Sequence, residues 1–447
     1  MLQKINGSPE ASAHLNTAGA ALKIKDAAYP APFESGLEYS PPARGTWNIV
    51  HTTMLVPESH QVYICAAGCL RGVVLTAAEM GCLDRFSSIL VEENNLMDGS
   101  MEALIEDGID DILQRLPKKP RFMFIYPACI HRFMGTDLDA VLTEVRRRHP
   151  EIGFSLCCMD PIMRKSGLTA EARTRWQIYS FLKPVPHDPK AVNIIGNNLP
   201  TKEDSELVRL IKDNGFTLRD LTLCHTAEEY LEMSKSFLNV SYNPLVTYGA
   251  AQLEETLGQK NLYLPLSFDC LEIRAALYQL ADALGVPRPD YTEAMLQLER
   301  SLFKARLVIG DTPVAIDYAA TFRPFSLAKQ LLYHEFNVTR IYTDLVAPED
   351  KKDFEYLQEH YPDLEIYSTL HHKMRVLPRH EEQFLVIGQK AAYFTGTRHF
   401  VDIAECGGLY GFSGLSHLAQ LMVEAYLTEK EAKEYIQTKG WGCNLCQ

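Results

Sequence analysis

Apolar residues along the chain follow two alternating patterns. Residues 121–126 form a short continuous apolar run, which predicts a buried strand. Residues 101–116 instead place Leu104, Ile109 and Leu113 on one helical face, with acidic residues opposite, which predicts an amphipathic helix. The same spacing predicts another helix over 138–148. The chain therefore reads as strands alternating with helices.

This alternation restarts twice, at 191–196 and at 305–311, and each restart is predicted to be a strand. Further helices are predicted over 202–214 and 326–336, and further strands near Leu238 and Leu262 and over 338–343 and 384–388. Strand–helix alternation builds parallel sheets covered by helices on both faces. We therefore expect an α/β protein with three Rossmann-like subdomains, over residues 47–188, 189–295 and 296–425.

The two ends of the chain lack this periodicity. Residues 1–46 carry Pro, Tyr and Phe with turn signals, and we expect an N-terminal arm that wraps its own domain or a partner subunit. Residues 426–447 are expected to form a C-terminal tail, and they include the C-x2-C pair Cys443 and Cys446. The pair is either redox-active or metal-binding with a partner, or incidental.

Composition narrows the class of protein. The 447 residues are 46% hydrophobic and 23% charged, which is typical of a globular chain, and the net charge is −13. No apolar run approaches the roughly 18 residues of a membrane helix, and no basic field favours nucleic acid. Residues 1–8 have no apolar signal core. We expect a cytoplasmic protein without membrane or nucleic-acid partners, in which the 11 cysteines stay reduced.

Cysteines follow two of the predicted strands. Cys65 and Cys69 come directly after the apolar run 62–64, and Cys129 comes after 121–126. In open parallel sheets, ligands gather at the carboxyl ends of the strands. Thiolates suit iron–sulfur clusters and zinc, but the chain has neither a second C-x2-C at a finger interval nor a suitably spaced histidine. From the residues alone, metal ligation and simple burial both remain open.

The order of the motifs resembles the nitrogenase component 1 family. That family includes the subunits of the nitrogenase molybdenum–iron protein, their cofactor-assembly scaffolds and the dark-operative reductases of chlorophyll biosynthesis. The resemblance spans about residues 46–425. The matching segments are Gly68-Cys69, the acidic segment Glu92–Gly99, Ala128-Cys129-Ile130, Val192–Gly196 and the glycine-rich Gly407–Leu415.

The resemblance implies a cofactor and partners. In the family, the two matched cysteines, here Cys69 and Cys129, ligate an iron–sulfur cluster at a subunit interface, either [4Fe-4S] or a larger P-cluster-like group. A homologous subunit is then expected, in a homodimer or an α2β2 heterotetramer. Electrons would come from a separate ATP-dependent iron–sulfur reductase, because this chain contains no Walker sequence.

Departures from the family pattern bear on the activity. The nitrogenase subunits have a further cluster cysteine upstream, where this chain has only Ser40, so either Cys65 or a partner protomer is expected to complete the ligand set. Asn239–Asn243 lacks the cofactor cysteine, and Ala404–Cys406 lacks the cofactor histidine. We therefore expect a nitrogenase-like oxidoreductase acting on a substrate other than dinitrogen. A non-catalytic scaffold for cofactor assembly and a cluster-free binding protein remain alternatives.

Other residues have both a functional and a structural interpretation. His131 and Arg132 either tune a reduced cluster or simply bond a loop, and Gly310–Pro313 is placed at the phosphate-loop position of a βα unit. Arg164–Gly167 is either an anion site or a solvated face, and Cys406 is a candidate for another cofactor. The remaining cysteines are interpreted as mainly structural, with Cys82 and the 157/158 pair as lesser candidates: Cys82, Cys157, Cys158, Cys224 and Cys270.

Overall fold

The computed structural model describes residues 19–39, 41, 45–157, 159, 169–376 and 383–430. Ser40, Cys158, Arg164–Gly167 and the pair Cys443 and Cys446 lie outside these residues. The chain divides into two compact units. The two-sheet unit comprises Trp47–Pro200 and Ile211–Leu264, and the one-sheet unit comprises the described parts of Met1–Thr46, Thr201–Leu210 and Pro265–Gln447.

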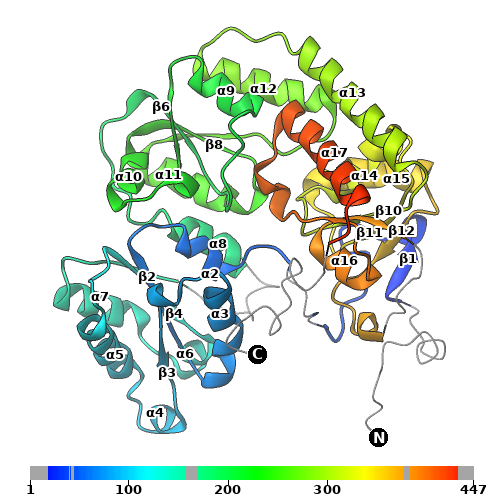
Figure 1. Cartoon of the computed structure of the whole chain (residues 1–447). Coiled ribbons are helices and arrows are strands. Elements are labelled where there is room, and N and C mark those ends of the chain that lie inside the picture. Colours follow the sequence, from blue (N-terminus) through cyan, green and yellow to red (C-terminus); the bar gives the residue numbers. More distant parts are fainter. Residues whose placement is uncertain are drawn as a thin grey trace, which may run out of the picture. The chain divides into compact units, whose positions relative to one another are not determined.

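The first sheet of the two-sheet unit has four parallel strands in the order β3-β2-β4-β5. They are β2 (Ser59–Cys65), β3 (Phe86–Leu90), β4 (Phe122–Pro127) and β5 (Gly153–Leu156). Helices α5 (Met101–Arg115) and α7 (Leu138–Arg148) cover one face, and α2 (Ile49–Met54) and α3 (Ala67–Glu79) cover the other (Figure 1). The predicted helices over 101–116 and 138–148 are thereby confirmed.

Side-chain alternation explains why both faces are covered. Val62 and Ile64 of β2 pack with Ile105 and Ile109 of α5, whereas the intervening Tyr63 belongs to the opposite cluster. Successive residues of a strand point to opposite faces, so a continuous apolar run needs helices on both sides. The run over 121–126 is the central strand β4 for this reason.

The second sheet of this unit is also parallel, in the order β7-β6-β8-β9. Its strands are β6 (Asp188–Ile194), β7 (Thr217–Asp220), β8 (Ser236–Ser241) and β9 (Lys260–Tyr263), with the helices α8 (Ala170–Gln177), α10 (Ala227–Glu232) and α11 (Thr247–Leu257). Asn239 is buried in this sheet and bonded by its amide to Asn193, Gln259 and Asn261.

The one-sheet unit has six strands in the order β1-β12-β11-β10-β13-β14, all parallel except β1. They are β1 (Ala21–Lys23), β10 (Val314–Asp317), β11 (Val338–Tyr342), β12 (Glu365–Tyr367), β13 (Leu385–Ile387) and β14 (Phe400–Val401). Its helices are α9 (Glu206–Lys212, which crosses the unit boundary), α12 (Cys270–Leu284), α13 (Thr292–Ile309), α14 (Pro324–Tyr333), α15 (Lys351–His360), α16 (Gln389–Thr395) and α17 (Gly411–Leu427).

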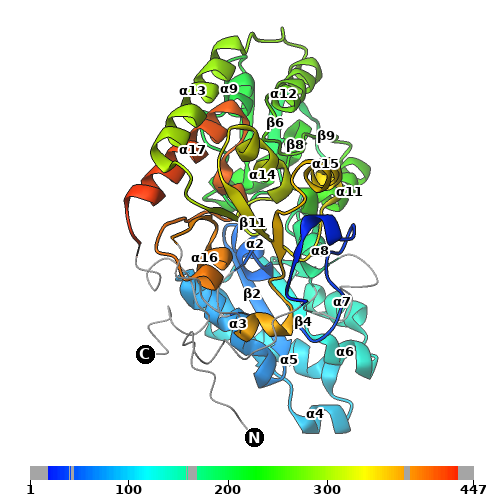
Figure 2. The same ribbon diagram turned by 90° about the vertical axis from the view of Figure 1, so that its right-hand side faces the viewer.

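The described part of the N-terminal arm packs on its own chain. Strand β1 pairs with β12 at the edge of the six-stranded sheet, and Val346 donates its N–H to the carbonyl of Pro30. Figure 2 shows this dark-blue N-terminal segment beside α15. The arm was expected to wrap either its own domain or a partner subunit, and its described residues pack on their own domain.

The predicted strand over 305–311 is wrong. These residues are the last turn of α13 and the turn that follows it, and the strand β10 begins only at Val314. Leu298, Leu302, Ala305 and Ile309 recur every three or four residues and are buried on the helix face that packs against α17. Gly310–Pro313 therefore precedes the strand, which removes it from the phosphate-loop position.

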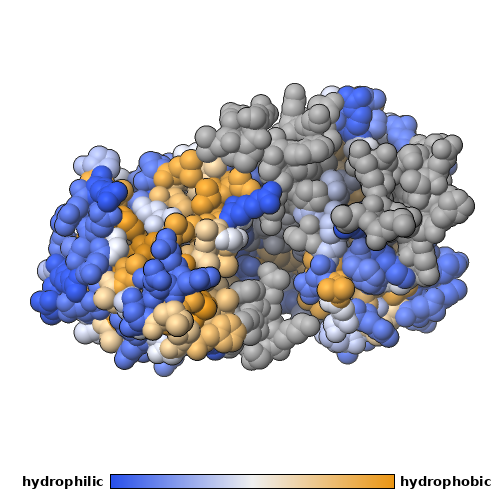
Figure 3. Space-filling model, turned by 90° about the horizontal axis from the view of Figure 1, so that it is seen from below, coloured by the Kyte–Doolittle hydropathy of each residue, from blue (hydrophilic) through white to orange (hydrophobic). Residues whose placement is uncertain are grey.

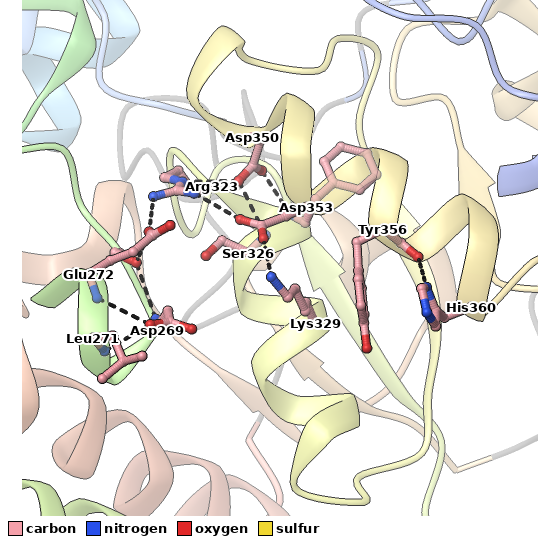
Figure 4. Close-up of polar contacts among 12 residues, drawn as sticks. Asp269, Leu271, Glu272, Arg323, Ser326, Lys329, Asp350, Asp353, Tyr356 and His360 are labelled. Atoms are coloured by element: carbon pink, nitrogen blue, oxygen red, sulfur yellow. Dashed lines mark hydrogen bonds and ion pairs between the residues drawn. The ribbon is translucent and has the colours of Figure 1, made fainter.

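A buried ion network ties three segments of the one-sheet unit together (Figure 4). The Arg323 guanidinium is paired with Asp350 at 3.1 Å, Asp353 at 2.8 Å and Glu272 of α12 at 3.1 Å. Asp350 also accepts the backbone N–H groups of Phe325 and Ser326 at the start of α14. The first turn of α12 is thus fixed to α14 and α15.

None of the helices in the described ranges is long and apolar enough to cross a membrane.

Candidate functional site

The carboxyl ends of β2 and β4 lie side by side and carry the three predicted site cysteines. The two strands are neighbours, with Ile64 in register with Pro127, and Ala128 donates its N–H to the carbonyl of Ile64 at 3.0 Å. Cys65 is the last residue of β2 and Cys129 the first of the short helix α6 (Cys129–Met134). Cys69 lies in the first turn of α3.

The three thiols are close enough to act on one another electrostatically. Burial, together with the nearby Cys69 and Cys129, raises the pKa of the Cys65 thiol to about 12. Cys65 is fully buried, Cys129 half-buried and Cys69 exposed. Without a positive charge beside it, Cys65 is therefore a neutral thiol at pH 7. Iron would reverse this, because a metal favours the thiolate.

Two helices begin directly after the neighbouring ends of β2 and β4. The N-cap residues are Ala66 for α3 and Ala128 for α6, and neither has a side chain that caps the helix. The first backbone N–H groups of a helix lack partners within it, and the N-terminus of α3 adds a partial positive charge. Negatively charged sulfur is the ligand chemistry that such an arrangement stabilises.

Glycines in α3 leave open space beside the thiols. A Cβ at Gly68 or Gly72 would meet nothing within 4 Å. By contrast, a Cβ at Gly108 of α5 would approach Ile89 Cδ1 at 2.6 Å, so that glycine is explained by packing. Glycine costs a helix about 1 kcal/mol relative to alanine. Packing within the described chain does not explain why position 68 is a glycine. A bulky group bound outside the chain would explain it.

Exposed apolar side chains come from the same strand–helix loops. Met97 of α4 (Glu93–Met97) is 88% exposed and Phe133 of α6 is 68% exposed, and Leu90 and Met134 are also exposed. Figure 3, seen from below, shows apolar surface over the half of the molecule that holds the first sheet. An exposed patch of this kind marks a surface that another molecule covers. The sequence pattern did not predict these exposed residues, although the apolar pair Phe133-Met134 soon after Cys129 was a signal.

His131 is fully buried beside Cys129. Its Nδ1 lies 3.1 Å from the carbonyl of Ala128, and its Nε2 is buried without a hydrogen-bond partner in the described structure. Burial lowers the pKa of the ring. The ring is thus held by the N-cap residue of α6, which fixes the turn that presents Cys129, and Arg132 is exposed.

The other cysteines described by the structure are not part of this group. Cys69 lies in the first turn of the 13-residue helix α3 and Cys82 lies beyond its C-terminal end, so most of the helix separates them. Cys157 is buried against Tyr63 and Tyr126, in the core cluster on the α3 side of the sheet, and Cys224 donates to the carbonyl of Asp220. Their packing supports the structural interpretation. Cys270 is the first residue of α12, in the one-sheet unit.

Cys406 lies in a different setting. Its thiol is buried in the one-sheet unit and donates to Thr321 Oγ1 at 3.4 Å, and burial raises its pKa to about 12. The adjoining cavity has a volume of about 20 Å³, roughly one water molecule. This space has no room for a large metal cofactor.

Within the described residues, no group of three or more His, Cys, Asp or Glu side chains has the geometry to hold a metal ion by itself. The three thiols at the first sheet share a neighbourhood and one sheet edge rather than a closed ligand shell. An additional ligand or a partner chain is needed to complete such a site.

Comparisons with known proteins identify the class. The sequence pattern of the family described as "Nitrogenase component 1 type Oxidoreductase" matches residues 52–426, and the chain belongs to this family. No curated protein matches the chain in sequence.

Solved structures agree with the fold. The structure titled "Nitrogenase Cp1 at pH 6.5" superimposes with a TM-score of 0.67 at 15% identity, covering 88% of this chain and 94% of the other. "Nitrogenase Cp1 at pH 5" gives a TM-score of 0.60 at 12% identity, covering 91% and 94%. The predicted family and the predicted α/β fold class are thus confirmed.

Proposed function

We propose that this chain is a subunit of a nitrogenase-like two-component reductase. Cys65, Cys69 and Cys129 hold an iron–sulfur cluster, [4Fe-4S] or larger, where the chain meets a homologous subunit. The cluster, when bound, accepts and donates single electrons at low potential. An ATP-dependent iron–sulfur reductase supplies the electrons.

One observation carries the proposal: three cysteines follow the neighbouring carboxyl ends of β2 and β4, next to two helix N-termini that have no side-chain cap. Cys69 is exposed, whereas Cys65 is fully buried behind it. Ligands at different depths hold a group that is partly embedded in the chain and partly open to a partner. The exposed Met97 and Phe133 surround this edge with apolar surface, which a second subunit covers and which keeps water away from the sulfur atoms.

The proposed substrate is not dinitrogen. The region in which the family's dinitrogen-reducing members carry a cofactor cysteine corresponds by resemblance to Asn239–Asn243, which has no cysteine, and Asn239 is engaged in a buried amide network with Asn193, Gln259 and Asn261. The segment Ala404–Cys406, before the glycine-rich segment, lacks the histidine that those members carry in this region, and the cavity beside Cys406 has a volume of about 20 Å³. Neither residue offers the chemistry or the space for the large cofactor.

The cysteine assignment is tested by anaerobic EPR of the dithionite-reduced protein, for wild type and the single variants Cys65→Ser, Cys69→Ser and Cys129→Ser. The matched control is Cys270→Ser, because Cys270, like Cys129, is the half-buried first residue of a helix. We expect each of the three variants to change or abolish the cluster signal and the control to leave it intact. A signal unchanged in Cys69→Ser and Cys129→Ser contradicts the assignment.

The scaffold alternative differs in what happens after the cluster is loaded. Substrate-dependent ATP hydrolysis by the reductase component, with steady product formation, supports the reductase. Transfer of a metal cofactor from this chain to an apo-protein, without turnover, supports the scaffold. The cluster-free alternative is excluded by stoichiometric iron and sulfide in the purified protein.

A further inference from the structure

Helix α13 exposes an apolar stripe in the one-sheet unit. Leu296 is 46% exposed, Phe303 62% and Leu307 68%. Their spacings of seven and four residues put them on one helix face. The opposite face, with Leu298 and Leu302, is buried and packs against α17 (Figure 1). The stripe is therefore a second apolar surface, carried by residues far from the thiols in sequence.

Two neighbouring elements widen this surface. His334, at the end of α14, bonds Glu299 of α13 at 2.9 Å, and Cys270 Sγ lies 4.0 Å from the same carboxylate. Tyr333 and Leu271, the chain neighbours of these two residues, are 75% and 60% exposed. Three exposed apolar side chains on α13 are thus accompanied by two more, Leu271 and Tyr333, on the elements bonded to it. Soluble monomers rarely leave a patch of this kind uncovered.

The patch is also held rigidly. The ion network of Arg323 fixes the first turn of α12 to α14 (Figure 4), and the Glu299–His334 bond fixes the end of α14 to α13. A surface whose elements are already ordered loses little conformational entropy when it is covered. This favours a docking surface over a loosely packed face.

The pattern along α13 is self-complementary. In a heptad repeat, positions a and d face the partner helix and position g flanks them. Leu296 and Phe303 occupy position d of such a repeat, and Arg300 and Leu307 occupy position a. Glu299 and Arg306 occupy position g. Suppose that two such helices run antiparallel, with a two-fold axis between residues 301 and 302. Heptad position a of one helix then faces position d of the other, and position g of one helix faces position g of the other. Leu296 then meets Leu307 of the other copy. Arg300 meets the ring of Phe303, whereas within each copy Glu299 is already bonded to His334 at 2.9 Å and Arg306 is already paired with Asp311 at 2.7 Å.

We propose that this surface, formed by α13 with Leu271 and Tyr333, is where a second copy of the chain docks, with the two α13 helices antiparallel. Both core layers of the pairing are favourable: apolar side chain against apolar side chain, and guanidinium against an aromatic face. Because the same patch serves both copies, the contact closes as a dimer instead of growing into a filament. The proposal does not depend on the iron–sulfur cluster.

The proposed dimer is tested by sedimentation velocity of the full chain at concentrations up to about 100 μM, which covers the dissociation constants of weak dimers. Phe303→Arg places two arginines in one layer, and we expect it to weaken dimerisation at least about tenfold. Phe303→Glu places a carboxylate opposite Arg300, so it weakens dimerisation by a clearly smaller factor. An apolar contact of any other register treats the two substitutions alike. Leu345→Arg, at an exposed leucine in the loop after β11, is the matched control and leaves the dimer intact.

Three results overturn the proposal. The wild type sediments as a single chain at every concentration, or Phe303→Arg dimerises like wild type, or Phe303→Arg and Phe303→Glu are equally impaired. The variant Phe133→Arg distinguishes a dimer formed through the α13 surface from one formed through the cysteine-bearing end of the first sheet. If the dimer is lost in Phe133→Arg but kept in Phe303→Arg, self-association occurs at the cysteine-bearing end instead. Iron content is measured on the same samples, so failure of the cluster assignment is seen independently.

Discussion

Burial of single ionisable residues gives this chain a specific response to acid. His60 of β2 is buried, and its Nε2 bonds Ser87 Oγ at 2.8 Å. Burial, with the nearby Arg85 cation, lowers the pKa of His60 to about 4. In the unfolded chain the imidazole takes up a proton below about pH 6.5. Between these two values the unfolded state binds more protons, so stability falls as the pH falls.

We therefore predict that part of the acid sensitivity between pH 6.5 and 4 comes from His60. Its contribution is at most about 3 kcal/mol over that window. In His60→Gln, the free energy of unfolding, measured by urea denaturation across the window, declines less steeply than in wild type. His360→Gln, on the exposed end of α15, serves as a control. If the free energy of unfolding falls with pH equally steeply in wild type and His60→Gln, His60 does not contribute to the acid sensitivity.

Two glycines allow a role in packing to be distinguished from a role in ligand binding by single substitutions to alanine. We predict that Gly108→Ala destabilises the protein by about 1–3 kcal/mol, because its Cβ would collide with Ile89. Gly68→Ala meets open space and is predicted to stabilise the cluster-free chain by up to about 1 kcal/mol. If a cluster lies there, Gly68→Ala lowers the bound iron. Equal destabilisation by both substitutions, by thermal and urea unfolding, counts against this reading.

At the scale of elements, the alternation of apolar and amphipathic segments was enough to predict most strands and helices. It failed at 305–311, because Leu307-Val308-Ile309 looks like a buried strand while only Ile309 and Ala305 of this segment are buried. The distinction depends on the earlier residues Leu298 and Leu302, whose helical spacing continues into this segment. Packing against α17, which is distant in sequence, decides between the two readings.

The Arg323 network is an element-scale feature that the sequence pattern did not reveal, because its partners are 27 to 51 residues away in the chain. We predict that Arg323→Ala destabilises the protein by about 3–5 kcal/mol, since the buried Asp350 loses the cation it is paired with and Asp353 keeps only Lys329. Arg288→Ala, which removes an exposed pair with Asp282, costs under about 1 kcal/mol. Similar unfolding midpoints for the two variants would refute the role of burial.

At the scale of the whole molecule, the thiols and the α13 surface lie in different compact units. The sequence could place Cys65, Cys69 and Cys129 at strand ends, because parallel strands present their carboxyl ends at one edge. It could not show that Cys65 is buried while Cys69 is exposed, nor that Met97 and Phe133 are left bare. Exposure depends on how loops lie over the sheet, which periodicity does not encode.

The central claim is that these thiols hold iron. The most direct measurement is iron and acid-labile sulfide per chain after anaerobic purification, for wild type, Cys69→Ser/Cys129→Ser and the Cys270→Ser control. The account predicts stoichiometric iron and sulfide in wild type and control, and a loss of most of both in the double variant. Iron and sulfide retained at the wild-type level in Cys69→Ser/Cys129→Ser would contradict it.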